Sequence, residues 1–195
     1  AAVITPISRD HSAFLGDTVT EIAKNKAGII KPKTTVISAL QPKEAADVIN
    51  KTARERNAAL RCSEAATDIT YGQDSTDFIY KDARYTIKML GAYQPKNAAL
   101  AIETATALGI SSAAIQAGLA AARLPYRFER IGKFILDGAH NEGAAREMAR
   151  SLEIYTRPGK IAFICGCFRD KDYKKTAELT SPYASAVYCV KPPTP

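Results

Sequence analysis

This sequence contains no long hydrophobic run. Its apolar stretches have the length of a β-strand and are interrupted by charged residues, so none could cross a membrane as a helix. No basic segment precedes the strand-like run at the start of the chain, and a signal peptide is therefore not expected. With 46% hydrophobic residues over 195 positions, the chain can still build a packed core. A soluble cytoplasmic protein of one large or two small domains is predicted.

Cysteine and histidine are scarce. The four cysteines form no C-x-x-C pair, and with only two histidines no zinc site can be assembled from them. Cys165 and Cys167 are two residues apart, where a disulfide would be strained; Cys62 and Cys189 are the other two. We expect all four to be reduced and buried, which argues against a disulfide-stabilised secreted module.

Acidic residues are outnumbered by basic ones, and the net charge is +7. A basic protein attracts polyanions. The Lys and Arg residues are scattered and are not interleaved with aromatic residues, so nucleic acid is not an expected partner. A nucleotide together with a polycarboxylate substrate would suit the charge, and so would a generic basic surface.

Apolar patterning predicts an α/β fold. Strands are expected at residues 1–7 and 34–39, and helices at 17–26, with Asp17 as cap and Gly28 as stop, and at 43–59. This alternation is typical of a parallel sheet with helical crossovers. Residues 67–90 instead alternate apolar and polar residues, with turns at 72–74 and 81–82, which indicates antiparallel strands at a sheet edge.

The second half repeats the alternation after two helices. The helices are predicted at 95–108 and 111–122, and residues 123–125 resemble a linker into a second domain. Beyond the linker, strands are expected at 134–136, 161–165 and 184–190, and a helix at 144–152. We expect the strand at 134–136 to be a parallel strand whose carboxyl end carries a polar cluster.

Residues 10–30, DHSAFLGDTVTEIAKNKAGII, hold a His and a Lys fifteen residues apart on a strand-loop-helix unit. The stretch resembles the central ATPase domain of folylpolyglutamate synthases, which are relatives of the Mur ligases. The resemblance implies that His11 is a ligand of Mg²⁺ and that Lys26 is carbamylated, binds the metal and serves catalysis. A carbamate would replace a repelling ammonium with the oxygen anion that Mg²⁺ prefers. Taken singly, an exposed loop His and a solvated helix Lys would be the simpler interpretation.

Residues 91–100, GAYQPKNAAL, are similar to the G-x-H-Q-x-x-N-A-A-L segment of the same family. The resemblance implies that Asn97 helps to hold the adenine of ATP and that Gln94 is its neighbour in cofactor binding. Tyr93 stands where the family usually has His, which puts any role of that His in doubt. Alone, an alanine-rich helix with one Asn would be ordinary core.

Residues 125–129, PYRFE, are similar to the family's P-x-R-F/L-E, whose Arg reaches the phosphates of ATP. Arg127 is therefore a candidate for cofactor binding and for stabilising charge on the transferred phosphoryl group. The alternative is a surface Arg that pairs with Glu129 or Glu103.

Residues 137–141, DGAHN, match the family's D-G-A-H-N-P almost completely, with Glu142 in place of the Pro. The resemblance implies that Asp137 and His140 face the nucleotide and the reacting phosphate as catalytic residues, Asp137 also binding the cofactor. A hydrogen bond between this His and Asp within the loop is the simpler alternative. Residues 166–172 are similar to a further family pattern, G-x-x-x-D-K-D.

The resemblance implies an ATP-dependent ligase that adds L-glutamate to the carboxylate of a folate through an acyl phosphate, with Mg²⁺ as cofactor. The substrate would be a folate or dihydropteroate, and the protein a monomer. Residues 1–122 would be the second half of the ATPase domain, with a mostly parallel sheet and an antiparallel portion, and 123–195 the first part of a Rossmann-like ligase domain. No G-x-x-G-K-S loop occurs, so the 195 residues alone are expected to be an inactive piece of a longer chain. A Mur-type peptidoglycan ligase and a non-catalytic nucleotide-binding fragment are the alternatives.

Overall fold

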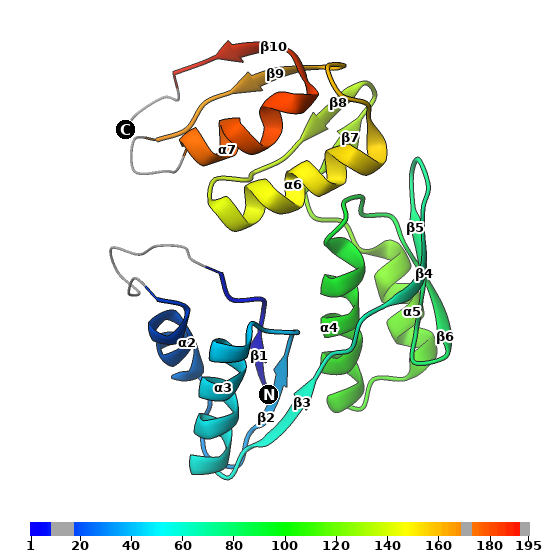
Figure 1. Ribbon diagram of the computed structural model, residues 1–195. Coiled ribbons are helices and arrows are strands. Elements are labelled where there is room, and N and C mark those ends of the chain that lie inside the picture. Colours follow the sequence, from blue (N-terminus) through cyan, green and yellow to red (C-terminus); the bar gives the residue numbers. More distant parts are fainter. Residues whose placement is uncertain (9–17, 169–172, 192–195) are drawn as a thin grey trace. The chain divides into compact units, whose positions relative to one another are not determined.

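The computed structural model describes residues 1–8, 18–168 and 173–191 (Figure 1). The chain divides into two compact units. The first comprises Ala1–Lys88 with Gln94–Arg123, and the second Met89–Tyr93 with Leu124–Pro195. None of the helices in the described ranges is long and apolar enough to cross a membrane.

A parallel three-stranded sheet forms one part of the first unit. Its strands run in the order β1 (Ala2–Ile4), β2 (Thr35–Ser38) and β3 (Ala59–Cys62), with α2 (Val19–Ala27) and α3 (Lys43–Glu55) as crossovers. The parallel sheet with helical crossovers is confirmed. Strand β3 was missed, because the predicted helix at 43–59 ends four residues early and Asn57 turns the chain with a φ of 49°.

Helices cover both faces of this parallel sheet. Val36 belongs to a buried cluster with Ile22 of α2 and Ile49 of α3, whereas the next residue, Ile37, packs with Leu100 of α4 (Gln94–Ala107). Successive side chains of a strand point to opposite faces, so β2 buries one residue against each layer. The sheet is therefore the middle layer and α4 one of its covers.

An antiparallel sheet completes the first unit. The predicted antiparallel strands are confirmed, but in the described part of the chain they form a sheet of their own and do not lie at the edge of the parallel sheet. Strands β4 (Thr67–Tyr71), β5 (Thr76–Tyr80) and β6 (Ala83–Ile87) are consecutive hairpins. Lys81 and Asp82 form the second turn with φ values of 46° and 63°, the conformation that a two-residue hairpin loop requires. The sheet buries Phe78 and Ile87 against α4 and α5 (Ser112–Ala121).

In the second unit, the described residues form two pairs of strands and two α-helices. Strands β7 (Glu129–Ile131) and β8 (Phe134–Leu136) are antiparallel, and β9 (Ile161–Cys165) and β10 (Ala184–Cys189) are parallel. Helix α6 (Glu142–Tyr155) follows β8, and α7 (Tyr173–Thr180) with the 3₁₀ helix η1 (Ser181–Tyr183) lies between β9 and β10 in the chain. The predicted strand at 134–136 exists, but its partner within the described residues is the antiparallel β7, which was not predicted.

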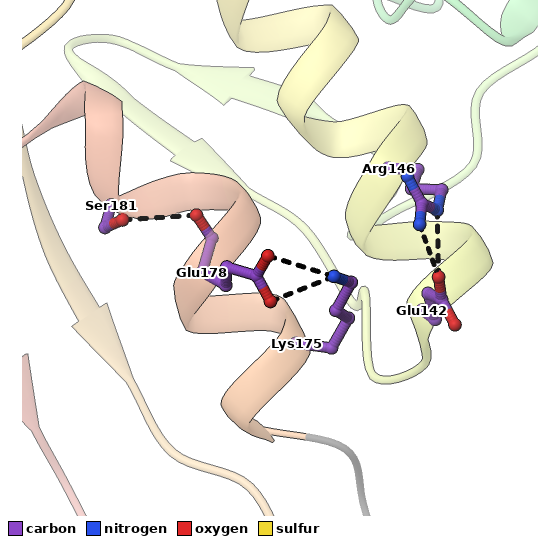
Figure 2. Close-up of polar contacts among 5 residues, drawn as sticks. All are labelled: Glu142, Arg146, Lys175, Glu178 and Ser181. Carbon is purple, nitrogen blue, oxygen red and sulfur yellow. Dashed lines mark hydrogen bonds and ion pairs between the residues drawn. The ribbon is translucent and has the colours of Figure 1, made fainter.

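Exposed ion pairs line α6 and α7 (Figure 2). Arg146 Nη2 lies 2.6 Å from Glu142 Oε1, and Lys175 Nζ lies 2.9 Å from Glu178 Oε2. The Ser181 hydroxyl donates to the Glu178 carbonyl at 3.2 Å and ties η1 to the end of α7. Pairs of this kind contribute little stability each, so they act mainly as local support for the helices.

The cysteines differ from the sequence prediction in one respect. All four are free thiols, as expected, but all four are exposed rather than buried. Cys165 and Cys189 are aligned on β9 and β10, and each of these strands has a partner on one side only among the described residues. The prediction of burial was therefore wrong.

Candidate functional site

Lys26 lies in the last turn of α2, on the exposed side of the helix. The helix begins with a capping box: Thr18 Oγ1 accepts the Glu21 N–H at 3.2 Å, and Glu21 Oε2 accepts the Thr18 N–H at 3.1 Å. The N-cap is therefore Thr18, whereas Asp17 was predicted. Gly28 ends the helix as predicted. His11 and Asp17 lie outside the described residues.

Gln94 and Asn97 are neighbours on the first turn of α4. Asn97 Nδ2 donates to Gln94 Oε1 at 3.2 Å. Gln94 is buried, and its Nε2 atom has no hydrogen-bond partner in the described part of the chain. A buried donor left unpaired costs about 1–3 kcal/mol, so an acceptor supplied by a ligand would be favourable here.

Arg127 lies on a strained turn of the second unit. The residues on either side of it, Tyr126 and Phe128, have φ values of 60° and 50°, which L-residues adopt rarely. The Tyr126 N–H donates to Glu129 Oε2 at 3.0 Å, so Glu129 supports the turn. The Arg127 guanidinium is close to the DGAHN loop, because a Cβ added to Gly138 would lie 3.8 Å from its Nη1 atom.

Asp137 ties that turn to the loop. Its Oδ2 atom accepts the Phe128 N–H at 2.8 Å and its Oδ1 atom accepts the Ala139 N–H at 2.7 Å. The charge of Arg127 also acts on this carboxylate. Burial raises the pKa of Asp137 above its ordinary value, although the hydrogen bonds and Arg127 oppose the rise.

His140 is exposed in the same loop. Its Nδ1–H donates to the Gly138 carbonyl at 2.9 Å, which leaves Nε2 as an acceptor facing away from that bond. The alternative prediction was a hydrogen bond between His140 and Asp137, but His140 Nδ1 bonds to the Gly138 carbonyl instead. Asn141 caps α6 by accepting the Ala144 N–H at 2.8 Å, so the loop ends in a fixed helix start.

The structure thus brings together three predicted residues, Arg127, Asp137 and His140, around the backbone of Gly138. Gln94 and Asn97 form a second pair in the first unit, and Lys26 lies on another helix of that unit. Sequence reasoning gave Tyr93 no role, whereas the structure places its ring against Gly91, close to Phe128 of the Arg127 turn. The only signal was its place in the segment GAYQPKNAAL, where the difference from the family made its role doubtful.

Known domains match both units. Residues 1–105 match the Mur ligase middle domain, and residues 126–195 match the Mur ligase glutamate ligase domain. The chain belongs to the Mur ligase family. Within it, its relatives are folylpolyglutamate and dihydrofolate synthases, as the motifs predicted.

The folylpolyglutamate synthase of Lacticaseibacillus casei is 34% identical over 98% of this chain and 49% of its own length. The dihydrofolate synthase/folylpolyglutamate synthase of Bacillus subtilis is 31% identical over 95% of the chain and 47% of its own. A solved complex of a folylpolyglutamate synthase with AMPPCP and folate superposes with a TM-score of 0.88 at 30% identity, over 98% of this chain and 50% of that one. The chain spans about half the length of the curated relatives it matches.

Proposed function

We propose that this chain is part of an ATP-dependent ligase that adds L-glutamate to the carboxylate of a folate through an acyl phosphate. The observation that carries the proposal is the cluster of Arg127, Asp137 and His140 around Gly138, in the region that matches the glutamate ligase domain. The relative solved with AMPPCP and folate supports ATP and folate as ligands. Glutamate and dihydropteroate as further substrates are part of the proposal.

Arg127 and His140 are proposed to act on the reacting phosphate. The guanidinium is always charged and offers several N–H donors, so it would bind phosphate oxygens and stabilise the charge that develops during transfer. His140 would present Nε2, since its Nδ1–H is held by Gly138. Asp137 uses each oxygen for one backbone N–H, and its remaining lone pairs leave room for a contact with the nucleotide.

Gln94 and Asn97 are proposed to bind the adenine. Their mutual hydrogen bond orients both amides, and the unpaired Nε2 of Gln94 would donate to a ring nitrogen of the base. This assignment explains why a buried donor is kept without a protein partner.

Lys26 and His11 remain proposed Mg²⁺ ligands, Lys26 as its carbamate. Among the described residues, no group of three His, Cys, Asp or Glu side chains could hold a metal ion. One lysine on an exposed helix face does not make a magnesium site, so the described residues do not fit the metal by themselves. The proposed mechanism therefore has no step through Mg²⁺.

The activity is proposed to require a longer protein, because the 195 residues contain no glycine-rich phosphate-binding loop. The test uses the protein as its source cell makes it, with ATP, L-glutamate and either a reduced folate or dihydropteroate. ADP release that depends on glutamate and on the pterin substrate is expected. Turnover only with peptidoglycan precursors would instead assign a Mur-type ligase, and nucleotide binding without turnover would assign a binding fragment. A monomer and a cytoplasmic location are also proposed; sedimentation and cell fractionation test them.

A further inference from the structure

Two cysteines occupy matching positions at the ends of neighbouring strands. Cys165 is the last residue of β9 and Cys189 is the last residue of β10, and the two are aligned partners in this parallel pair. The Val190 N–H donates to the Cys165 carbonyl at 2.9 Å, so the pairing of the strands continues past the cysteines. The two backbones are therefore held side by side where the thiols lie.

Both thiols lie on the same face of the sheet. Aligned residues of a parallel pair project to one side, and the side alternates along each strand. Phe163, two residues before Cys165, packs in a cluster with Leu152 of α6, so the two cysteines belong to the face that carries this helix. Phe163 is half-buried there, whereas both cysteines are exposed. Small reagents in solution can therefore reach them.

The spacing of the two backbones suits a disulfide. Neighbouring strands lie about 4.7–4.9 Å apart, and the Cα atoms of bridged cysteines are usually about 4.4–6.8 Å apart. The two cysteines could therefore be bridged without a movement of the strands. Exposed disulfides are more easily reduced than buried ones, so a bond at this position would be a labile one that forms and breaks with the redox conditions.

We propose that Cys165 and Cys189 form a strand-end dithiol, a site that small disulfides such as oxidised glutathione oxidise reversibly to an intramolecular disulfide. One thiolate of the pair attacks oxidised glutathione, forms a mixed disulfide and releases one glutathione thiolate. The other thiolate attacks the protein sulfur of the mixed disulfide, so the intramolecular bond forms and the second glutathione leaves. The protein pair loses two electrons, which reduce the glutathione disulfide, and the two thiol protons pass to the two glutathione products.

The reaction requires a thiolate, which sets the conditions for oxidation. Burial raises the pKa of the Cys165 thiol, and the neighbouring sulfurs of Cys189 and Cys167 raise it further. Oxidation should therefore be faster at mildly alkaline pH than at neutral pH. Cys167 lies two residues after Cys165, beyond the end of β9, and is the competing partner that the test must distinguish.

The strand-end dithiol lies at the carboxyl edge of the β9–β10 pair, the edge at which open α/β sheets bind ligands. A bond between Cys165 and Cys189 would join the two segments that leave the strands at this edge. The inference goes beyond the proposed ligase activity and does not depend on it, so either can fail without the other.

The test is disulfide mapping of the protein as its source cell makes it. The protein is reduced, freed of reductant and treated with oxidised glutathione at about pH 8.5, the ordinary pKa of a thiol. Trypsin should then release the peptide of residues 161–169 joined to the peptide that begins at Thr176, and dithiothreitol should separate the two. A folded protein that yields no joined peptide would overturn the proposal.

Single substitutions identify the paired sulfurs, because the peptide of residues 161–169 also contains Cys167. Cys165→Ser and Cys189→Ser should each abolish the joined peptide, whereas Cys167→Ser should leave its yield unchanged. All three positions are exposed, so the variants should fold. A joined peptide that persists in Cys165→Ser and is lost in Cys167→Ser would assign the bond to Cys167 and contradict the proposal.

Cys62→Ser is the matched control. Cys62 is also exposed and also ends a parallel strand, β3, but its aligned partner on β2 is Ser38. Its substitution should change neither the yield nor the position of the joined peptide. In urea, wild type should give glutathione adducts in place of the joined peptide, because unfolded strands no longer hold the thiols together. Equal yields of joined peptide with and without urea would show that the fold does not make the site.

Discussion

At the scale of single residues, the backbone around Arg127 departs from what its side chains favour. Tyr126 and Phe128 are left-handed without being glycine or asparagine, at a cost of about 1–3 kcal/mol each. The strain is held by Asp137, by Glu129 and by the buried ring of Phe128. The motif PYRFE predicts Arg127 as a candidate site residue. It contains no glycine or asparagine that would indicate left-handed residues on either side of Arg127, so the backbone conformation that holds Arg127 could not be predicted from the sequence.

Replacing Arg127 with Ala should lower turnover far more than stability. The side chain is exposed, so its loss should change the free energy of unfolding by no more than about 0.5 kcal/mol. Loss of a charge that stabilises a transferred phosphoryl group should reduce kcat by roughly 10²–10³-fold. Steady-state ADP release and urea unfolding measure the two effects.

Arg130→Ala is the matched control, since Arg130 is an exposed arginine three residues further along, on β7. It should leave kcat within about twofold of wild type, as for a surface substitution. Equal losses in the two variants would mean that general positive charge, and not the place of Arg127, matters.

Glu103 is a buried carboxylate with a structural role. It is 5% exposed, accepts the Tyr80 hydroxyl at 2.8 Å and pairs with Lys81. Burial alone would raise the pKa of Glu103, but hydrogen bonds from Lys81 and Tyr80 outweigh it, and the pKa lies below its ordinary value. The sequence also suggested that Arg127 could pair with Glu103. The Glu103 carboxylate already has partners in Tyr80 and Lys81 and does not need Arg127.

Glu103→Gln should lower the free energy of unfolding by about 1–2 kcal/mol at pH 7. The effect should be no larger, because Lys81 is half exposed and solvent screens its ion pair with Glu103. A lowered folded-state pKa stabilises above the ordinary pKa, and that contribution is lost as the pH falls through the lowered value. The difference between wild type and variant should therefore shrink below about pH 4. Urea unfolding at several pH values measures it; a difference that grows on acidification would be inconsistent with this sign.

At the scale of elements, α2 depends on its first turn. The Thr18 and Glu21 capping box satisfies backbone donors that would otherwise be unpaired, and the helix has only nine residues. Thr18→Ala should cost about 1 kcal/mol of unfolding free energy. Glu21→Gln is the control, because Gln at this position can still accept the Thr18 N–H. Loss of stability in Glu21→Gln with none in Thr18→Ala would show that charge, and not the reciprocal hydrogen bonds, supports the helix.

Long amphipathic helices and alternating strands were predictable, but two of the short strands, β3 and β7, were not. The helix at 95–108 is indicated by its apolar stripe, and the hairpin turn by the Lys81-Asp82 pair between alternating strands. Both elements are present in the structure. Strand β7 has three residues and β3 four, too few to show a period. Their place is set by pairing with β8 and β2, which is tertiary information.

At the scale of the whole molecule, the sequence proposes segments for the candidate site but does not predict how these segments group. Met89–Tyr93 was assigned with the helix that follows it, whereas its contacts lie in the second unit. These contacts come from one buried Leu and one backbone N–H, neither of which forms a periodic pattern. The grouping therefore depends on packing that only the folded chain reveals.

The proposed reaction depends on an acyl phosphate formed from the folate carboxylate, and one isotope measurement tests that step. The substrate is labelled with ¹⁸O in its carboxylate and is turned over with ATP and L-glutamate by the protein as its source cell makes it. Transfer of the phosphoryl group to a carboxylate oxygen, followed by attack of the amine, leaves that oxygen on the released phosphate. We predict that one ¹⁸O atom appears in the inorganic phosphate for each amide formed from the labelled carboxylate. Unlabelled phosphate accompanied by amide formation would contradict the acyl-phosphate mechanism.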